Sequence, residues 1–544
     1  MPESRTWLPD LRLAALVGVL VVARLAYLAW SCPYSLVEDE AQYWVWSQNL
    51  ALSYYTKGPG IAWTIAASTA LLGDTEFGVR FAAPLFSGLM TLAAAGLVRT
   101  ITGDPRRALY AAFALQLAPI LQATALLGTI DGPYGAFWAL AACFGWRAFN
   151  RGGFANWIAL GASIGLGFLF KYTILLLVPG LAMFAIVAAR ARAGHQAPGD
   201  RRSPFGPVLA LGALVICASP VLIWNDQHHW PTLAHLLGHV GFAEHGAGAP
   251  APVHVEPGEP WSPLWLPQFL GTQLGLAGPG LLLASIGLVR AWRARRDPQQ
   301  QGLVYLALCG VPILLFYLLL SLIAEPEGNW PLAAYVTLLP LGGIVAADGI
   351  AAWRERVAAW RCIPPPRPRE GVLLARPESP VQILWHVTVG FGLVCGIVMA
   401  RVDLLARVPA VGGFVPVGRL RQGAELAAGV QAARARLRES TGADPTIVAA
   451  HYGRASQLAF YLPGRPPVFC ASSRLGGRPT PQDFWPAHDL DTALYFGQPK
   501  LLLVGGTIEQ WSTIVIDVRD LGAVPGLERK GLRVFSAVGR RPLD

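Results

Sequence analysis

Long apolar stretches recur along the chain and predict a protein that crosses a membrane many times. A helix needs about 20 predominantly apolar residues to span a bilayer. About eleven stretches meet this pattern, at residues 11–30, 79–101, 108–128, 133–149, 156–170, 174–189, 205–224, 270–290, 303–323, 331–350 and 383–401. The predicted fold class is therefore a polytopic α-helical membrane protein.

The charges between these stretches predict how the chain is oriented. Arg-rich loops follow every second span, at residues 99–107, 147–151, 190–202, 290–296 and 354–376. Positively charged loops stay in the cytoplasm, so we expect these loops and the N-terminus there. The remaining loops are then extracytoplasmic, as in a multi-pass protein of the inner (plasma) membrane. This orientation requires that residues 158–189 form two short helices that meet at Phe170-Lys171-Tyr172, because one helix of that length would reverse everything after it.

The composition of the chain changes after about residue 402. Residues 420–439 have the pattern of an amphipathic helix, and short apolar runs predict strands at 446–450, 467–470, 501–504 and 532–538. We therefore predict a transmembrane domain over residues 1–401 and a small extracytoplasmic α/β domain over residues 402–544.

Composition and charge exclude a soluble protein and a nucleic-acid-binding one. Of the 544 residues, 53% are hydrophobic and only 14% are charged. The net charge is +10, but the Arg residues lie in separate short loops and form no continuous basic face. We expect contacts with membrane lipids and none with nucleic acid.

The first extracytoplasmic loop carries the strongest signal of chemistry. Three consecutive acids, Glu38-Asp39-Glu40, follow the first span and precede an aromatic cluster and Lys57. Acids beside a membrane are costly, so they indicate a functional site. If residues 38–50 are helical, Asp39, Tyr43, Trp46 and Leu50 share one face. The alternative is a solvated acidic loop with aromatic anchors.

Other polar residues lie at the predicted extracytoplasmic ends of spans. Asp131 opens a span in the segment TIDGPYGAFW, where it is a site residue, a helix N-cap or both. Three cations, Lys57, Arg80 and Lys171, either contact lipid headgroups or receive a lipid phosphate. A short loop carries further candidates, namely Glu327, Asn329 and Trp330.

A metal site and a nucleotide site have weaker support. His235 and His239 have the spacing of two ligands on one helix, without an acidic third ligand fixed by sequence. No cofactor is therefore assigned, and a divalent metal stays open. GxGxxG, Walker, HExxH and GxSxG motifs do not occur in a fitting context.

Five segments resemble one known family. They read DEAQYWVWSQNLALSYYTKGP (39–59), DGPYGAFW (131–138), FLFKYTILLLVPGL (168–181), SPVLIWNDQHHW (219–230) and NWPLAAY (329–335). In this order they are similar to the GT-C-fold membrane glycosyltransferases of family 39, which include protein O-mannosyltransferases and lipid A aminoarabinose transferases. SQLAFYLPGRPPVFC and PQDFW, near the C-terminus, resemble the family weakly.

The resemblance implies an inverting transfer of a sugar from a polyprenyl-phosphate donor to a hydroxyl acceptor outside the cytoplasm. Asp39 is then the expected catalytic base, Glu40 its neighbour in the motif, and Asp131 the second acidic position. Lys57 and Arg80 match cations near the lipid phosphate. The full set of expected substrate-binding residues is Tyr43, Lys57, Arg80, Lys171, Tyr172, Glu327, Asn329 and Trp330.

The chemistry of such a transfer agrees with these residue types. A hydroxyl that attacks an anomeric carbon needs a base within hydrogen-bond reach, and a departing phosphate is stabilised by fixed cations. The acceptor, a lipid, a glycan or a protein, stays open. The alternatives are a transporter or flippase of a lipid-linked sugar, which would be expected to carry mid-membrane charges and paired repeats, and a non-catalytic membrane scaffold.

Overall fold

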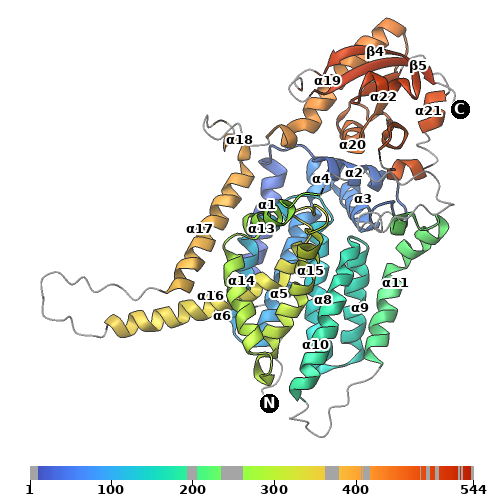
Figure 1. Cartoon of the computed structure of the whole chain (residues 1–544). Coiled ribbons are helices and arrows are strands. Elements are labelled where there is room, and N and C mark those ends of the chain that lie inside the picture. Colours follow the sequence, from blue (N-terminus) through green and yellow to red (C-terminus); the bar gives the residue numbers. More distant parts are fainter. Residues whose placement is uncertain are drawn as a thin grey trace, which may run out of the picture. The chain divides into compact units, whose positions relative to one another are not determined.

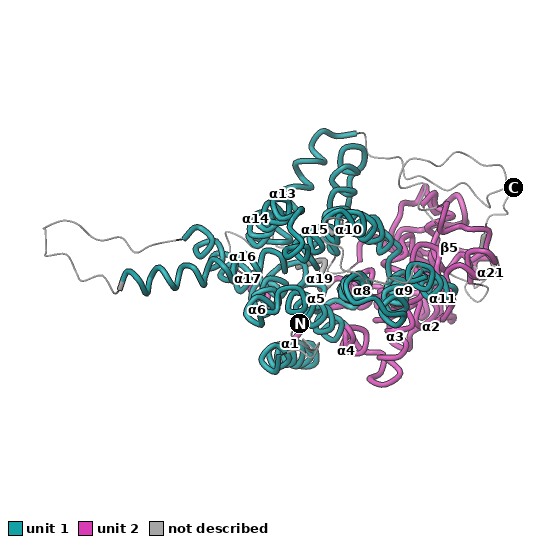
Figure 2. The backbone as a smooth tube through the Cα atoms, turned by 90° about the horizontal axis from the view of Figure 1, so that it is seen from below, with its two compact units in different colours: residues 1–30, 83–219, 261–400 teal, residues 31–82, 220–260, 401–544 magenta. Residues whose placement is uncertain are grey.

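Two compact units make up the computed structural model, which describes residues 10–192, 205–234, 261–361, 379–405, 407, 417–477, 479–485, 490–495, 501–524, 527 and 531–540. The first unit comprises residues 1–30, 83–219 and 261–400, and the second comprises residues 31–82, 220–260 and 401–544 (Figure 2). The second unit thus joins residues 31–82, which follow the first span, to the C-terminal region. The division into domains 1–401 and 402–544 stays a prediction.

The first unit is a bundle of helices (Figure 1). Its helices are α1 (Leu11–Trp30), α5 (Ala82–Thr102), α6 (Pro105–Gln116), α7 (Pro119–Thr124), α8 (Asp131–Arg151), α9 (Phe154–Phe168), η1 (Tyr172–Leu176), α10 (Leu177–Arg192), most of α11 (Gly206–Gln227), α13 (Trp265–Ala277), α14 (Gly280–Arg293), η2 (Pro298–Gln300), α15 (Gln301–Leu320), α16 (Leu332–Arg361) and α17 (Pro380–Ala400). Among the described residues, seven helical segments are long and apolar enough to cross a membrane, or eight if α13 and α14 form one bent span. The chain is a multi-span membrane protein.

Two of the predicted spans are broken in the structure. Residues 108–128 form the separate helices α6 and α7, because Pro119 lacks the N–H that a continuing helix would use. Residues 270–290 are bent by 101° between α13 and α14, where Gly278 adopts a φ of +68° and Pro279 follows. Each of these two predicted spans is therefore an interrupted helix in the structure.

The prediction for residues 158–189 is confirmed. Helix α9 ends at Phe168, the 3₁₀ turn η1 follows, and α10 begins at Leu177. Lys171 directly precedes η1 with an extended backbone. The chain therefore breaks its helix at the charged residue that interrupts the apolar stretch.

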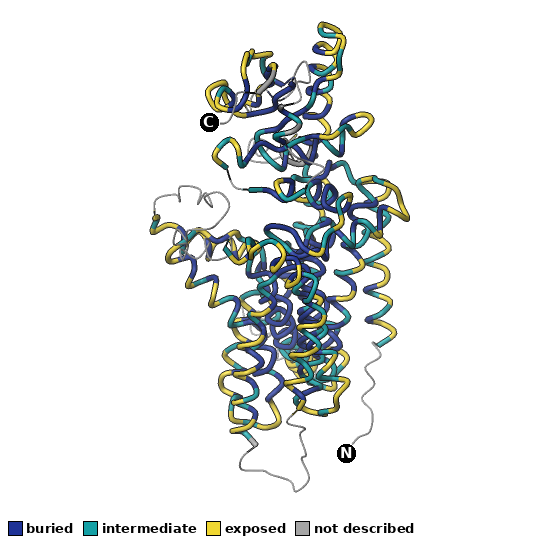
Figure 3. Tube along the Cα trace, turned by 90° about the vertical axis from the view of Figure 1, so that its right-hand side faces the viewer, coloured by how far each residue is buried: buried dark blue, intermediate teal, exposed yellow. Residues whose placement is uncertain are grey.

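Residues 332–347 of α16 are buried in the bundle, where small residues let backbones approach closely. In its spanning window 67% of residues are buried, compared with 17% in α1 or α17, and Figure 3 shows buried positions concentrated on the inner helices. A Cβ on Gly343 would lie 2.7 Å from the backbone of Ala111 in α6, and one on Gly342 would lie 2.8 Å from the backbone nitrogen of Ala284 in α14. These glycines set the distance between α16 and its neighbours.

The second unit combines short helices with a five-stranded sheet. Its helices are α2 (Glu38–Gln48), α3 (Gly60–Leu72), α4 (Glu76–Arg80), α18 (Val402–Leu405), α19 (Val417–Thr441), α20 (Tyr452–Tyr461), η4 (Ser472–Leu475), η5 (Pro481–Phe484), α21 (Leu490–Tyr495) and α22 (Ile508–Ser512). Its strands are β1 (Thr446–Ala449), β2 (Val468–Cys470), β3 (Leu501–Val504), β4 (Val515–Ala523) and β5 (Arg533–Arg540). The predicted α/β region and its amphipathic helix are confirmed.

The strand order of the sheet is β2-β1-β3-β5-β4. Strands β2, β1 and β3 are parallel, with Ile447 opposite both Val468 and Leu502. Strand β5 runs antiparallel to β3 and to β4. The sequence missed β4, an edge strand whose register shifts leave Asp517 and Arg519 exposed, so it lacks the apolar alternation that predicts a strand.

The close approach of α16 to α6 gives a stability prediction. Gly343→Val should lower the free energy of unfolding by about 1–3 kcal/mol, because the new side chain has no room beside Ala111. Gly390→Val in α17 is the matched control, since a Cβ there meets nothing within 4 Å. The measurement is thermal unfolding in detergent, and equal melting temperatures for the two variants would contradict the packing argument.

Candidate active site

Three acids open helix α2 in the second unit. Val37 precedes the helix with an extended backbone, and Glu38, Asp39 and Glu40 form its first turn, where negative charge is favourable to the helix dipole. Successive helical residues point about 100° apart, so the acids have different surroundings. Asp39 is exposed, Glu38 is partly exposed, and Glu40 is completely buried.

Glu40 and Arg80, at the end of α4, form a buried bidentate ion pair. Arg80 Nε donates to Glu40 Oε1 at 2.8 Å, and Nη2 donates to Oε2 at 2.6 Å. The two side chains are 0% and 3% exposed. Glu40 Oε2 also accepts from the backbone N–H of Val37 at 3.1 Å. The pair therefore fixes the first turn of α2 against α4.

The guanidinium group of Arg80 also donates hydrogen bonds to the chain that leads into α2. Nη1 donates to the carbonyl of Tyr34 and Nη2 to the carbonyl of Ser35, both at 2.8 Å. Arg80 is thus surrounded by acceptors from its own unit. The expected contact of Arg80 with lipid phosphate and the expected catalytic role of Glu40 stay predictions.

The aromatic residues after the acids form a packed cluster within α2 and the loop that follows. Tyr43 and Trp46 lie edge to face with ring centroids 5.1 Å apart, and Trp46 stacks on Tyr54 at 4.5 Å. All three are buried, and the Tyr54 hydroxyl donates to the carbonyl of Trp46 at 2.9 Å. Leu50 lies beyond the end of α2 and is exposed, so its predicted place on the face shared with Asp39 is wrong.

Lys57 lies in the irregular loop between α2 and α3. Its carbonyl accepts hydrogen bonds from the Tyr54 N–H at 3.0 Å and from the Ser53 hydroxyl at 3.3 Å, and the residue is partly exposed. The backbone of the loop is thereby fixed where the Lys57 side chain leaves it.

A second cluster, in the first unit, joins three predicted site residues from distant parts of the chain. Asp131 Oδ1 accepts from Lys171 Nζ at 2.9 Å, and Oδ2 accepts from Asn329 Nδ2 at 2.8 Å. The Asp131 and Lys171 side chains are only 8% and 10% exposed. The N-cap alternative for Asp131 is wrong, because Ile130 occupies that position and Asp131 is the first helical residue of α8.

Aromatic residues surround this cluster. Lys171 Nζ lies 5.3 Å from the centre of the Tyr134 ring, within the range of a cation–π interaction. Thr173 donates to the Tyr134 hydroxyl at 3.1 Å. Tyr172 packs instead on Phe168, with ring centroids 4.7 Å apart. Lys171 is buried and forms an ion pair with Asp131. This contact differs from the alternative, in which Lys171 would bind a lipid headgroup.

The short loop between α15 and α16 carries the other candidates. Trp330 packs on Tyr317 with ring centroids 5.7 Å apart, and Gln273 donates to the carbonyl of Gly328 at 3.1 Å. Glu327 is exposed. It lines a cavity of about 290 Å³ whose walls also include Trp265, Gln268, Phe269, Thr272 and Glu325.

The predicted metal ligands His235 and His239 lie outside the described residues. Within the described ranges, His, Cys, Asp and Glu side chains form no group of three or more that could hold a metal ion.

Tyr461, at the end of α20, was not among the residues that the sequence predicted for the site, yet it binds the chain that leads into α2. Its hydroxyl donates to Glu76 and accepts from the Leu36 N–H at 2.6 Å. Gln457 donates to the carbonyl of Leu36 at 3.1 Å. Burial, with the neighbouring Glu76 carboxylate, raises the pKa of Tyr461 well above its ordinary value, so the hydroxyl remains a donor. The available signal was the segment SQLAFYLPGRPPVFC, which contains both residues.

The fold belongs to a known class of membrane protein. The chain is similar to the crystal structure of ArnT from Cupriavidus metallidurans bound to undecaprenyl phosphate, with a TM-score of 0.57 and 15% identity over 97% of both chains. The apo form of that protein gives a TM-score of 0.54 with 16% identity, again over 97% of both. At such identities the likeness shows the fold alone.

Sequence comparisons agree with the fold. Residues 56–224, which include Asp131 and Lys171, match the family model of dolichyl-phosphate-mannose-protein mannosyltransferases. The lipid A galacturonosyltransferase RgtD of Rhizobium johnstonii is 30% identical over 301 residues, which are 55% of this chain and 58% of that protein. An undecaprenyl phosphate-α-4-amino-4-deoxy-L-arabinose arabinosyl transferase of Pseudomonas fluorescens is 28% identical over 375 residues, 64% of this chain and 62% of that protein.

These matches confirm the resemblance of the chain to GT-C-fold membrane glycosyltransferases of family 39. The alignments span less than two thirds of the length of either relative.

The buried pair at α2 gives a prediction on stability. Glu40→Gln should lower the free energy of unfolding by about 3–5 kcal/mol, because it leaves the Arg80 charge buried without a counterion. Asp39→Asn makes the same chemical change one residue earlier, at an exposed position, and should leave thermal unfolding unchanged. A Glu40→Gln melting temperature equal to that of the wild type would refute the assigned role.

The pair at Asp131 should behave as one buried unit. Lys171→Met and Asp131→Asn should each destabilise the protein, and the double variant should recover part of the loss because no unpaired charge remains. The surface pair of Arg434 and Asp444 is the control, with an expected coupling of about 0–1 kcal/mol. Thermal unfolding of both cycles measures the couplings, and additive effects at Asp131 and Lys171 would show that the pair is not coupled.

Proposed function

We propose that this chain is an inverting glycosyltransferase that moves a sugar from a polyprenyl-phosphate donor to a hydroxyl acceptor at the outer face of the inner membrane. The observation that carries the proposal is the exposed carboxylate of Asp39 beside the buried Glu40–Arg80 pair. A base must be accessible to substrate yet held in place, and this arrangement provides both properties.

In the proposed reaction, Asp39 is the general base. The acceptor oxygen attacks the anomeric carbon as its proton passes to the Asp39 carboxylate. The bond from the anomeric carbon to the phosphate oxygen breaks, and its electron pair leaves with polyprenyl phosphate. One displacement from the opposite side inverts the configuration at that carbon, and no sugar becomes bonded to the protein.

Lys57 is proposed to stabilise the departing phosphate. Its loop is fixed by two hydrogen bonds to the Lys57 carbonyl, and a lysine ammonium binds phosphate as a compact point charge. Arg80 acts indirectly, since its guanidinium binds Glu40 and two backbone carbonyls. We accordingly assign Glu40 and Arg80 as positioning residues for Asp39.

For the Asp131 cluster we propose a supporting role within the first unit. The bond from Asn329 to Asp131 ties the loop between α15 and α16 to the start of α8, and Lys171 neutralises the carboxylate. Asn329 and Trp330 lie on that loop and Tyr172 follows Lys171, so the cluster would hold these expected substrate contacts in place.

The relatives support the substrate class. One is named for transfer of galacturonic acid to lipid A, and another for transfer of aminoarabinose from undecaprenyl phosphate. We propose donors of this polyprenyl-phosphate type and an acceptor that is a lipid, a glycan or a protein, with lipid A among the first to test. The N-terminus is proposed to be cytoplasmic. Because these relatives are transferases, a transporter or flippase function is not proposed.

Asp39→Asn tests the proposed base. The variant should lose transfer by at least about 10²-fold while its melting temperature stays unchanged, because the amide cannot accept the proton. Transfer is measured in membranes with a panel of polyprenyl-phosphate sugars and lipid A, by release of polyprenyl phosphate. Glu439→Gln, at an exposed position at the end of α19, is the matched control and should keep full activity.

If Asp39→Asn transfers sugar as fast as the wild type, the base is another residue. Correctly folded wild-type protein that consumes none of the donors would count against the transferase proposal itself.

A further inference from the structure

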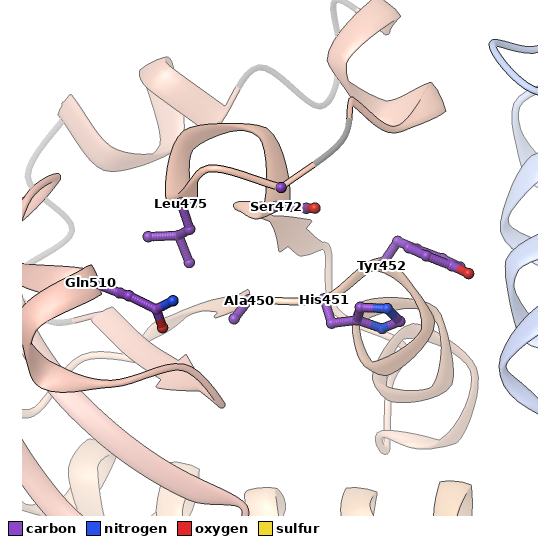
Figure 4. Close-up of a pocket in the computed structure, with 7 residues that line it drawn as sticks. Ala450, His451, Tyr452, Ser472, Leu475 and Gln510 are labelled. Carbon is purple, nitrogen blue, oxygen red and sulfur yellow. The ribbon is translucent and has the colours of Figure 1, made fainter. Parts of the chain in front are cut away.

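An open pocket of about 410 Å³ lies in the second unit, at the carboxyl ends of the parallel strands β1, β2 and β3. Its volume is within the range of small-molecule sites, roughly 300–1,000 Å³. Figure 4 shows six of the residues that line it, namely Ala450, His451, Tyr452, Ser472, Leu475 and Gln510. None of the residues assigned to catalysis above lines this pocket.

The topology of the sheet explains why the pocket is there. Strand β1 lies between β2 and β3, so the chain leaves β1 toward one neighbour and later returns on the other side. In open α/β sheets, ligands bind beyond the carboxyl ends of strands at such a switch point. Here the segments that follow β1, β2 and β3 each contribute a wall, through His451, Ser472 and Gln510 respectively.

Two glycines pack closely against residues that line the pocket. A Cβ on Gly477 would lie 2.6 Å from the Ser472 hydroxyl, and one on Gly506 would lie 3.2 Å from Gln510 Oε1. Gly506 has a φ of +73°, which L side chains rarely adopt. A side chain at either position would therefore press against a residue that lines the pocket.

The lining combines polar and apolar residues and includes no Asp, Glu, Lys or Arg. Ser472 provides a hydroxyl, and Gln510 accepts the Thr507 N–H through Oε1 at 3.0 Å, which leaves its amide nitrogen to donate to a ligand. His451 accepts the Gly453 N–H through Nδ1 at 3.2 Å, so in the neutral ring Nε2 carries the proton. Leu475 adds an apolar wall that points into the pocket (Figure 4).

This chemistry fits a sugar ring better than a phosphate. A sugar offers hydroxyls that donate and accept, together with apolar C–H faces, and needs no opposite charge. An anion would use cations or a helix N-terminus, but Glu38 already lies at the start of α20. Its Oε2 is 3.8 Å from His451 Nδ1 and would lie 2.6 Å from a Cβ on Gly453.

The contact with Glu38 also connects the pocket to the proposed base. Glu38 meets the wall residue His451, and the next residue of α2 is Asp39. All of these residues belong to the second unit. A sugar held in the pocket therefore lies near the turn of α2 that carries Asp39.

We infer that this pocket binds a sugar ring of the acceptor and thereby determines which glycosylated acceptor is used. The inference rests on the proposed function for its role in transfer, but sugar binding by the pocket is independent of transfer. It assigns Gln510, Ser472 and Leu475 as specificity-determining residues.

Two variants and one control test the inference. Leu475→Trp should fill the pocket, and Gln510→Ala should remove one hydrogen-bond donor and acceptor. Glu509→Gln changes the exposed neighbour of Gln510, outside the pocket lining, and is the matched control. Thermal unfolding checks that each variant is folded.

The first readout is binding without transfer. Saturation-transfer NMR is recorded on the full chain in nanodiscs, carrying Asp39→Asn, with methyl glycosides of glucose, galactose, glucosamine and galacturonic acid. At least one glycoside should give a signal that Leu475→Trp abolishes, that Gln510→Ala weakens and that Glu509→Gln preserves. No signal from any glycoside, or a signal that survives in Leu475→Trp, would overturn the inference.

The second readout separates this inference from the proposed function. With lipid A as acceptor and Asp39 intact, Leu475→Trp should raise the KM for acceptor at least tenfold and leave the KM for donor unchanged. An unchanged acceptor KM would overturn the role in acceptor selection. A wild-type protein that binds a glycoside but transfers no sugar would instead count against the proposed function and leave the binding site established.

Discussion

The buried ion pair of Glu40 and Arg80 is the interaction on which the candidate site depends. Burial of two charges is costly unless each is fully hydrogen-bonded, and here both carboxylate oxygens and all three guanidinium nitrogens have partners. The pair binds α4 to the first turn of α2 and to the chain before it. It therefore decides where the neighbouring carboxylate of Asp39 points.

The Asp131 cluster is also a buried carboxylate with hydrogen-bonded partners, but its partners come from distant parts of the chain. Its carboxylate joins residues 40 and 198 positions away in the chain, so one buried acid fixes α8, the turn before η1 and the loop before α16. Asp39, by contrast, is exposed. Glu40 and Asp39 are adjacent in one motif, yet Glu40 is buried within the protein and Asp39 lies at its surface.

The sequence predicted the elements better than the contacts. Apolar length predicted the helical segments, and Lys171 correctly marked a break between two helices, because a charge interrupts an apolar run visibly. The breaks at Pro119 and at Gly278-Pro279 were missed, since Pro and Gly are also tolerated within membrane helices. Strand β4 was missed because its alternation is disturbed by register shifts.

For the site, the motifs predicted Asp39, Glu40, Arg80, Asp131, Lys171 and Asn329 as candidates, but not which of them are hydrogen-bonded to each other. Pairing depends on tertiary geometry, and three nearby cations are equivalent in a sequence. The pocket beyond β1, β2 and β3 was also invisible, because small and uncharged residues carry no pattern. Only the strand order placed Ser472 and Gln510 across from His451.

The most direct test of the central claim is the configuration of the product. Purified wild-type protein in proteoliposomes is given a polyprenyl-phosphate sugar of defined anomeric configuration, and the anomer in the glycosylated acceptor is determined by NMR. A single displacement with Asp39 as base predicts complete inversion and no sugar bonded to the protein by mass spectrometry. Retention of configuration, or a trapped sugar on a side chain, would contradict the account.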